Sequence, residues 1–399
     1  MKKIIITIVA AMLGGVAVAQ QALWGGQPIT SPEVHPNGTV TFRYQAPATV
    51  AKVEVTGDFL PTTKREIPNY GTVELPGVAE LTKDASGVWS YTSAPLEGEL
   101  YSYSFIVDGL SVKDPNNVYM IRDVASVTNV FIVPGGQGTL YSVQDVPHGT
   151  VARLWYDSPT LGMTRRITIY TPPGYETSKA KYPVLYLNHG AGGDEEAWIA
   201  LGRTAQILDN LIAEGKATPM LVVMSNGNAW QKAAPGEDEE GMYKPSFLGQ
   251  RAIMQGQFEP SYADIIKFIE SNYRVIKKKS GRAIAGLSMG GFHSLHVSRI
   301  MPNTFDYVGL FSAAIMPGAD VQSPTYADID GTLAAQRDNG LKLYWIACGN
   351  TDFLWEANLD YMKKLDGMGF PYTFRESEGG HIWKNWRIYL GEFVPMLFK

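Results

Sequence analysis

The segment 282–291 constrains the fold of this chain more than any other. An apolar run at 283–285 enters Gly-Leu-Ser-Met-Gly at 286–290, and a helix-compatible segment at 292–300 leaves it. Glycine on either side of the serine lets a strand and a helix pass closely through a sharp turn, because a Cβ would crowd the two backbones. A G-x-S-x-G turn of this kind presents its serine beside the N-terminal amides of the helix, where negative charge is favoured. We therefore predict that Ser288 is a nucleophile.

Strands and helices alternate on both sides of this turn, from residue 145 to residue 399. Buried or alternating apolar runs predict strands at 151–156, 166–170, 184–187, 220–224, 282–287, 307–311, 341–347 and 372–376. Apolar residues at helical spacing predict helices at 198–214, 262–271 and 383–398, besides the one that leaves the turn. Alternating β and α segments predict a doubly wound, mostly parallel sheet of the α/β-hydrolase type.

A serine hydroxyl needs a base, usually a histidine that a carboxylate holds in place. In α/β-hydrolases the histidine comes last in the chain, and three histidines follow Ser288. His293 and His296 fall on the helix that leaves the turn, where they are too local to face the serine. His381 lies in a glycine-containing loop at 378–383, and we predict that it is the base.

The carboxylate is expected between the serine and the histidine. Asp352 follows the strand predicted to end in Ala-Cys-Gly at 347–349, at the sheet edge where such sheets place their sites. Glu356 and Asp360 are alternatives, although both fall on the helix expected to follow. We predict that Asp352 holds the imidazole.

Two backbone amides are expected to stabilise the oxyanion of an acyl-transfer reaction. One belongs to Met289, directly after the nucleophile. The other is expected in the glycine-containing loop 188–193, and we select Ala191. His189, in the same loop, precedes the serine and is predicted to be a structural hydrogen-bonding residue. No metal-ligand spacing is found in the sequence, so it predicts neither a metal nor a cofactor.

The N-terminal sequence and the composition limit the location and the partners expected for this protein. Residues 1–19 combine two lysines, an apolar run and Ala-Val-Ala before Gln20, which predicts a secretory signal peptide and a periplasmic or secreted protein. A membrane anchor is the weaker alternative because the apolar run is short. The net charge of −5 argues against nucleic-acid binding. The single cysteine, Cys348, excludes an internal disulfide and is predicted to be a buried strand residue.

Residues 22–134 read as an antiparallel β-sandwich, because short alternating runs are separated by turn residues. A linker is expected at 135–144. The region resembles the early-set, immunoglobulin-like domains that precede catalytic domains in glycogen-branching enzymes and some esterases, and that are often classed as carbohydrate-binding modules. The matching residues are Gly-Asp-Phe at 57–59, Gly-Val-Trp at 87–89, Tyr-Ser-Tyr-Ser-Phe at 101–105, Val-Asp-Gly at 107–109 and Asp-Pro-Asn-Asn at 114–117. Trp89, Tyr101 and Tyr103 are predicted to be core residues rather than sugar-stacking ones.

The region 145–399 resembles carbohydrate esterase family one, the feruloyl and acetylxylan esterases. The matching motifs are Pro-Pro-Gly-Tyr at 172–175, Tyr-Pro-Val-Leu-Tyr-Leu at 182–187, His-Gly at 189–190, the serine turn, Cys-Gly-Asn-Thr-Asp at 348–352 and Gly-Gly-His-Ile-Trp at 379–383. The resemblance implies the same nucleophile, acid and base. Segment 226–257 has no counterpart and is expected to be an insertion beside the site. Four tryptophans are expected near the site, either stacking on a phenolic ring or packing: Trp198, Trp230, Trp383 and Trp386.

The leading hypothesis is an exported feruloyl esterase that releases ferulate from arabinoxylan. Three alternatives stay open. They are an acetylxylan esterase, a siderophore trilactone esterase and a carbohydrate-binding protein with an inactive hydrolase domain. Export weighs against a cytoplasmic siderophore substrate, and the intact set of serine, aspartate and histidine weighs against an inactive domain. The sequence leaves the acyl group, the sugar polymer and the oligomeric state undetermined.

Overall fold

The computed structural model describes residues 29–67, 71–237 and 254–399. The predicted signal peptide, most of the acidic run at 237–240 and part of the predicted insertion at 226–257 lie outside the described residues. Within the described ranges, no helix is long and apolar enough to cross a membrane.

The chain divides into two units. One contains residues 1–96 and 102–119, and the other contains residues 97–101 and 120–399. The segment 120–134, which the strand pattern grouped with the sandwich, thus falls in the second unit. The stretch expected to be a linker contains the short helix α2 (Gly136–Tyr141). The domain boundaries inferred from the sequence stay a prediction.

The first unit is built from β-strands. Its strands are β1 (Glu33–Val34), β2 (Val40–Gln45), β3 (Val53–Gly57), β4 (Thr63–Ile67), β5 (Gly71–Leu75), β6 (Gly77–Glu80), β7 (Thr82–Lys83), β8 (Val88–Thr92), most of β9 (Leu100–Val107) and β10 (Leu110–Val112). One sheet has the order β1-β2-β8-β7, and β9, β3 and β6 are neighbours in another. Phe42 of β2 packs edge-on against Tyr103 of β9, with ring centroids 5.0 Å apart, so the sheets share an aromatic core.

The aromatic residues singled out in the sequence belong to the core. Trp89, Tyr101 and Tyr103 are 7, 8 and 1% exposed. Rings buried to this degree have no face open to a sugar, which confirms the prediction of a packing role.

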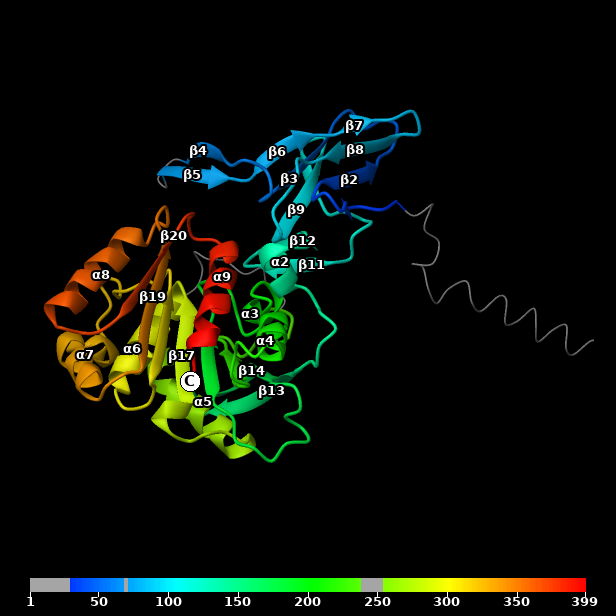
Figure 1. The fold of residues 1–399 in the computed structure, drawn as a ribbon. Helices are drawn as coiled ribbons and strands as arrows, with labels where there is room; N and C mark the ends of the chain where they lie inside the picture. The colour runs from blue at the N-terminus through cyan, green and yellow to red at the C-terminus, as the bar shows by residue number, and fades with distance from the viewer. Residues whose placement is uncertain (1–28, 68–70, 238–253) are drawn as a thin grey trace, which may run out of the picture. The chain divides into compact units, whose positions relative to one another are not determined.

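The second unit contains an eight-stranded sheet with the order β13-β14-β16-β15-β17-β18-β19-β20 (Figure 1). Its strands are β13 (Thr150–Ser158), β14 (Met163–Thr171), β15 (Val184–Asn188), β16 (Leu221–Ser225), β17 (Arg282–Leu287), β18 (Tyr307–Phe311), β19 (Leu343–Gly349) and β20 (Thr373–Ser377). β14 pairs antiparallel with β13 and with β16, and every pairing from β16 through β20 is parallel. The unit also contains the hairpin of β11 (Met120–Asp123) and β12 (Ser126–Ile132). The predicted α/β-hydrolase sheet is confirmed.

Helices cover both faces of this sheet. They are α3 (Ala197–Ala200), α4 (Thr204–Ala213), α5 (Phe258–Asn272), α6 (Met289–Ile300), α7 (Ile329–Asp338), α8 (Trp355–Gly367) and α9 (Trp383–Phe393). Successive residues of a strand point to opposite faces. In β17, Ile284 accordingly joins the core cluster with α5 to α8, while Ala283 and Ala285 join the cluster with α4 and α9. Both faces are buried, which explains why the parallel strands read as continuous apolar runs.

Two predicted helices were too long. The helix expected at 198–214 is interrupted, because Arg203 adopts a left-handed backbone with φ 53° and begins α4 as a separate element. The Arg203 guanidinium donates to the carbonyl of Tyr141, which fixes this break. The helix expected at 383–398 ends at Phe393, because Pro395 lacks an amide hydrogen and lies in a short 3-10 turn, Val394–Met396.

Candidate active site

Ser288 lies between β17 and α6, at the N-cap of the helix, with φ 54° and ψ −118°. A serine with positive φ is strained by about 1–3 kcal/mol, so surrounding contacts have to maintain it. Two backbone contacts do so. The Ser288 amide donates to the Phe311 carbonyl at 2.9 Å, and the Ser288 carbonyl accepts from the Ala314 amide at 3.1 Å. The turn is thereby tied to the neighbouring strand β18.

The glycines that flank the serine are required by close approach. A Cβ on Gly286 would lie 2.3 Å from the carbonyl oxygen of Gly290, and a Cβ on Gly290 would lie 2.2 Å from that of Asn188. Neither position has room for any side chain, because backbone atoms cannot move aside. The steric reason inferred from the sequence is therefore seen in the structure.

The predicted acid and base are hydrogen-bonded to each other. His381 Nδ1 lies 3.0 and 2.9 Å from the two carboxylate oxygens of Asp352. The Asp352 side chain is fully buried and the His381 side chain is 19% exposed. The Leu354 amide donates to Asp352 Oδ1 at 2.9 Å, which fixes the carboxylate orientation. This geometry leaves Nε2 of His381 as the nitrogen that can take a proton from a hydroxyl.

The serine, the aspartate and the histidine follow parallel strands at one edge of the sheet. Leu287 of β17, Phe311 of β18 and Ala347 of β19 lie opposite one another in register, and β20 is the next strand. Ser288 follows β17, Asp352 follows β19 and His381 follows β20. Carboxyl ends of parallel strands meet at one edge, which is where open α/β sheets bind their ligands.

The alternative residues have other surroundings. His293 Nδ1 lies 2.8 Å from the Glu259 carboxylate, and His296 Nε2 lies 3.0 Å from the Ile315 carbonyl; both residues belong to α6 and are fully buried. Glu356 and Asp360 lie on α8, as expected.

The predicted oxyanion donors are two backbone amides without hydrogen-bond partners among the described residues. Met289 is the first residue of α6, and Ala191 lies in the loop after β15. The two segments are adjacent, because a Cβ on Gly190 would lie 3.3 Å from the Cβ of Ser288. Free amides that the fold fixes in place are the donors that an oxyanion requires.

His189 braces this loop, as predicted for a structural residue. Its Nε2 accepts from the Gly227 amide at 2.7 Å, so its Nδ1, 2.8 Å from the Gly190 carbonyl, carries the proton and donates. Burial lowers the pKa of His189 to about 4, because desolvation disfavours the charged ring. The ring is therefore neutral at ordinary pH.

The Glu195 carboxylate, which follows the same loop in sequence, is hydrogen-bonded to residues of the predicted insertion. Glu195 accepts from the Ala234 amide at 2.8 Å and from the Asn226 side chain at 3.1 Å. Burial, followed by the charge of neighbouring Asp194, raises the pKa of Glu195 to about 7. The described part of the predicted insertion thus borders the oxyanion loop.

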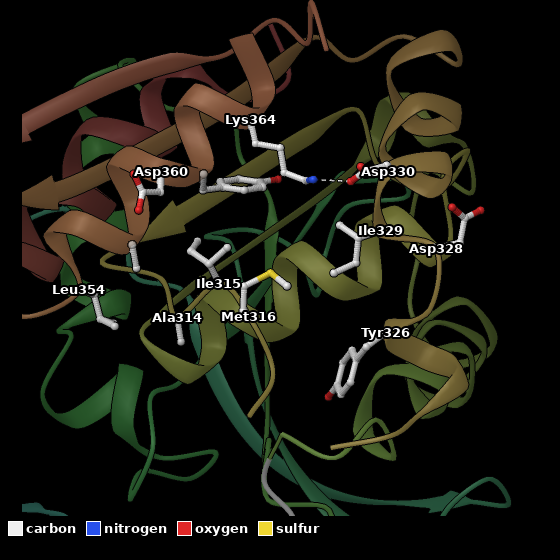
Figure 2. A pocket seen from close by; sticks show the side chains of 12 residues that line it. Ala314, Ile315, Met316, Tyr326, Asp328, Ile329, Asp330, Leu354, Asp360 and Lys364 are labelled. Carbon is white, nitrogen blue, oxygen red and sulfur yellow. Dashed lines mark ion pairs between the residues drawn. The ribbon is translucent and has the colours of Figure 1, made fainter. Parts of the chain in front are cut away.

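A pocket of about 870 Å³ lies between the loop after β18, the start of α7 and helix α8 (Figure 2). It has a mixed lining, with apolar side chains and several carboxylates: Ala314, Ile315, Met316, Tyr326, Asp328, Ile329, Asp330, Leu354, Ala357, Asp360, Tyr361 and Lys364. The Asp330 carboxylate pairs with Lys364 across it. Ser288 and His381 are not among its lining residues. Two lining residues nevertheless contact the predicted site. The Ala314 amide donates to the Ser288 carbonyl, and the Leu354 amide donates to the Asp352 carboxylate.

Aromatic side chains surround the histidine. Phe353 is 72% exposed, and its ring centroid lies 4.5 Å from that of His381. Trp386 is buried and also packs edge-on against the imidazole, with ring centroids 4.8 Å apart. Trp198 is core, whereas Trp230 is 60% exposed. The sequence did not single out Phe353, and only its position directly after Asp352 could have signalled it.

The Esterase family model, described as "Putative esterase", matches residues 158–397. An endo-1,4-beta-xylanase/feruloyl esterase of Xylanibacter ruminicola is 27% identical over 375 residues, which are 92% of this chain and 46% of that protein. An esterase of Mycobacterium tuberculosis is 28% identical over 280 residues, covering 68% of this chain and 51% of that one. The chain thus spans about half the length of these curated relatives.

Solved structures extend the comparison to the fold. A ferulic acid esterase superposes with a TM-score of 0.50 at 26% identity, covering 62% of this chain and 97% of that one. The enterobactin esterase of Shigella flexneri superposes with a TM-score of 0.59 over 90% of this chain and 92% of its own, at 17% identity. The second likeness concerns the fold alone.

Proposed function

The chain belongs to the Esterase family, and from this premise we propose that it is a serine carboxylic-ester hydrolase that releases ferulate from feruloylated arabinoxylan. The observation that carries the proposal is the His381–Asp352 hydrogen bond at the same sheet edge as a strained serine turn. The xylanase/feruloyl esterase relative, similar over nearly the whole chain, supports the substrate class. Membership also agrees with the resemblance to carbohydrate esterase family one that the motifs indicated.

The proposed reaction gives each predicted site residue one role. Ser288 Oγ attacks the ester carbonyl carbon while His381 Nε2 takes its proton, and Asp352 stabilises the imidazolium that forms. The amides of Ala191 and Met289 bind the oxyanion. Collapse of the tetrahedral intermediate returns the proton to the departing sugar alcohol. Water, deprotonated by the same histidine, then hydrolyses the acyl-serine and releases the acid.

The pocket next to the serine supports an aromatic acyl group over an acetyl group. Ile315, Met316 and Ile329 give it an apolar wall, to which a phenolic ring can bind, and acetate would leave most of its volume empty. The carboxylates of Asp328 and Asp360 are also part of the lining and can accept hydrogen bonds from a phenol. We assign this pocket to the acyl group.

The deciding experiment measures ferulate and acetate released from one feruloylated, acetylated arabinoxylan preparation. Wild-type protein is expected to release ferulate, and the Ser288→Ala variant, correctly folded by circular dichroism, is expected to release none. Acetate without ferulate would favour an acetylxylan esterase. Hydrolysis of a catecholate trilactone in place of both would favour a siderophore esterase.

A second experiment tests the acyl pocket. Ala357 is exposed on α8 and lines the pocket, so Ala357→Trp would fill it without disturbing the core. Gly367→Trp, on the same helix, absent from the lining and with open space around an added Cβ, is the matched control. We expect kcat/KM for methyl ferulate to fall about tenfold in the first variant, and that for 4-nitrophenyl acetate to change little. Equal losses for the two esters would exclude this pocket as the acyl site.

Export remains part of the proposal. A cell-wall polysaccharide lies outside the cell, so the signal peptide predicted at 1–19 fits the proposed substrate. The proposal requires neither a cofactor nor a metal ion. Glycan binding by the first unit stays a prediction.

A further inference from the structure

The turn of the β11–β12 hairpin lies against the oxyanion loop. Asp123 pairs with Ser126, so Val124 and Ala125 form a two-residue connection. Val124 has φ 48°, a left-handed conformation that a β-branched residue rarely adopts. Both the hairpin and the loop belong to the second unit. A strained valine at the tip therefore has to be maintained by what it touches.

Val124 contacts Gly192, the residue after the proposed oxyanion donor Ala191. Gly192 has φ 83°, and a Cβ built on it would lie only 2.6 Å from a methyl carbon of Val124. The valine side chain thus occupies the space beside the loop backbone that a larger residue would need. Any shift of the loop toward the hairpin is blocked by this contact.

Arg122, in strand β11 close to the turn, pairs with Asp194, which directly follows the loop 188–193. Its guanidinium pairs with the Asp194 carboxylate, whose side chain is 1% exposed, and also donates to the Val124 carbonyl at 2.9 Å. Asp194 Oδ1 in turn accepts from the Glu196 amide at 3.0 Å. One arginine therefore ties the hairpin tip to the residues that begin α3.

The turn also reaches the histidine side of the site. Burial of the carboxyl group raises the pKa of Asp123, while a hydrogen bond with the Trp383 side chain acts in the opposite direction. Trp383 packs edge-on against Trp386 at 5.2 Å, and Trp386 packs against His381. The hairpin tip is thus in contact with both the oxyanion loop and the aromatic support of the base.

We propose that Arg122 and Val124 are positioning residues that fix the Ala191 amide in its oxyanion-binding place. The inference rests on the proposed function, because it presupposes that Ala191 is a donor. Oxyanion donors act on the transition state more than on the bound ester. Loosening the loop should therefore lower kcat and leave KM nearly unchanged.

Val124→Gly is the most informative variant. Glycine adopts φ 48° without strain, so the variant should unfold at the same temperature as wild type or higher, although the contact with Gly192 is lost. We expect kcat for 4-nitrophenyl acetate to fall about tenfold, with KM within twofold, because a displaced donor keeps only part of its effect. The inhibition constant of phenylboronic acid, which forms a tetrahedral adduct with the serine, should rise by about the same factor.

Met120→Gly is the matched control, because Met120 is exposed on the same hairpin and pairs with Asn129 rather than with Arg122 or Val124. It should lower the unfolding temperature without changing kcat. Arg122→Gln should repeat the kcat loss, and Arg122→Lys should restore part of it through the retained charge. An unchanged kcat and boronic-acid affinity in Val124→Gly, or equal kcat losses in both glycine variants, would overturn the proposal. The assay uses an unspecific ester, so a wrong acyl specificity would not affect it. Full activity of Ser288→Ala on this ester would instead refute the proposed function.

Discussion

The neutral state of His189 predicts a measurable dependence of stability on pH. An unfolded histidine takes a proton near pH 6.5, whereas burial lowers the pKa of His189 in the folded protein to about 4. Between these values the unfolded state binds more protons, so the stability that this residue contributes is lost as pH falls. The gap between the two pKa values corresponds to about 3 kcal/mol of unfolding free energy, and most of it is lost by pH 4.5.

Glu195 has the opposite effect and would mask this loss in wild-type protein. Burial raises the pKa of its carboxyl to about 7, so the folded state binds the extra proton between about pH 4.5 and pH 7. Its contribution thus grows as pH falls. The effect of His189 must therefore be measured as a difference between wild type and a His189→Gln variant, in which the other groups titrate alike.

The assay is urea unfolding of both proteins at pH 7.5, 6.5, 5.5 and 4.5, followed by tryptophan fluorescence. Trp198 reports on this region, because its indole donates to the Asn188 carbonyl next to the loop. Wild type should be the more stable protein at pH 7.5, and the difference in unfolding free energy should shrink by about 2–3 kcal/mol at pH 4.5. A difference that changes by less than about 1 kcal/mol would refute the assignment of a buried neutral ring. An NMR titration that shows the His189 ring protonating near pH 6.5 would refute it directly.

Two further predictions concern other described contacts. Asp352→Asn keeps the shape of the site, but the asparagine amide donates a hydrogen bond to His381 and favours the wrong tautomer of the imidazole. We expect kcat to fall about 10³- to 10⁴-fold with little change in stability. A loss below tenfold, measured from full pH-rate profiles, would remove Asp352 from the role of acid. Glu99 and Arg387 form a buried ion pair at 2.9 Å. Glu99→Met leaves the arginine unpaired and should lower the free energy of unfolding by about 3–5 kcal/mol. The double variant with Arg387→Met should regain most of this loss, as measured by urea unfolding.

The sheet and the serine turn could be predicted because each depends on a local pattern. Apolar runs marked the parallel strands, and the two glycines marked a turn in which backbones touch. The chain order of α/β-hydrolases then indicated His381, and the expected sheet edge indicated Asp352. Asp352 and His381 are hydrogen-bonded, although the sequence separates them by 29 residues. Their catalytic roles, and those of Ala191 and Met289, stay predictions.

The remaining features depend on contacts between distant segments. Nothing in Arg-Asp-Val-Ala-Ser at 122–126 signals a turn, because valine and alanine are poor residues for positive φ. Only the packing of Val124 on Gly192 explains it. The break before α4 likewise depends on the bond from Arg203 to a carbonyl 62 residues earlier. Helical spacing carries no information about such partners.

The division of the chain into two units limits the positions at which domains can be recombined between related esterases. The second unit takes up residues 97–101, gives way to residues 102–119 of the first unit, and resumes at residue 120. A single cut therefore cannot separate the two units, because the chain passes between them three times. Recombination near residue 145, where the sequence pattern placed the start of the hydrolase domain, would leave behind both the hairpin at 120–132 and Glu99, the partner of a buried arginine. Successful shuffling should preserve 97–101 and 120–399 together and join them with a new loop.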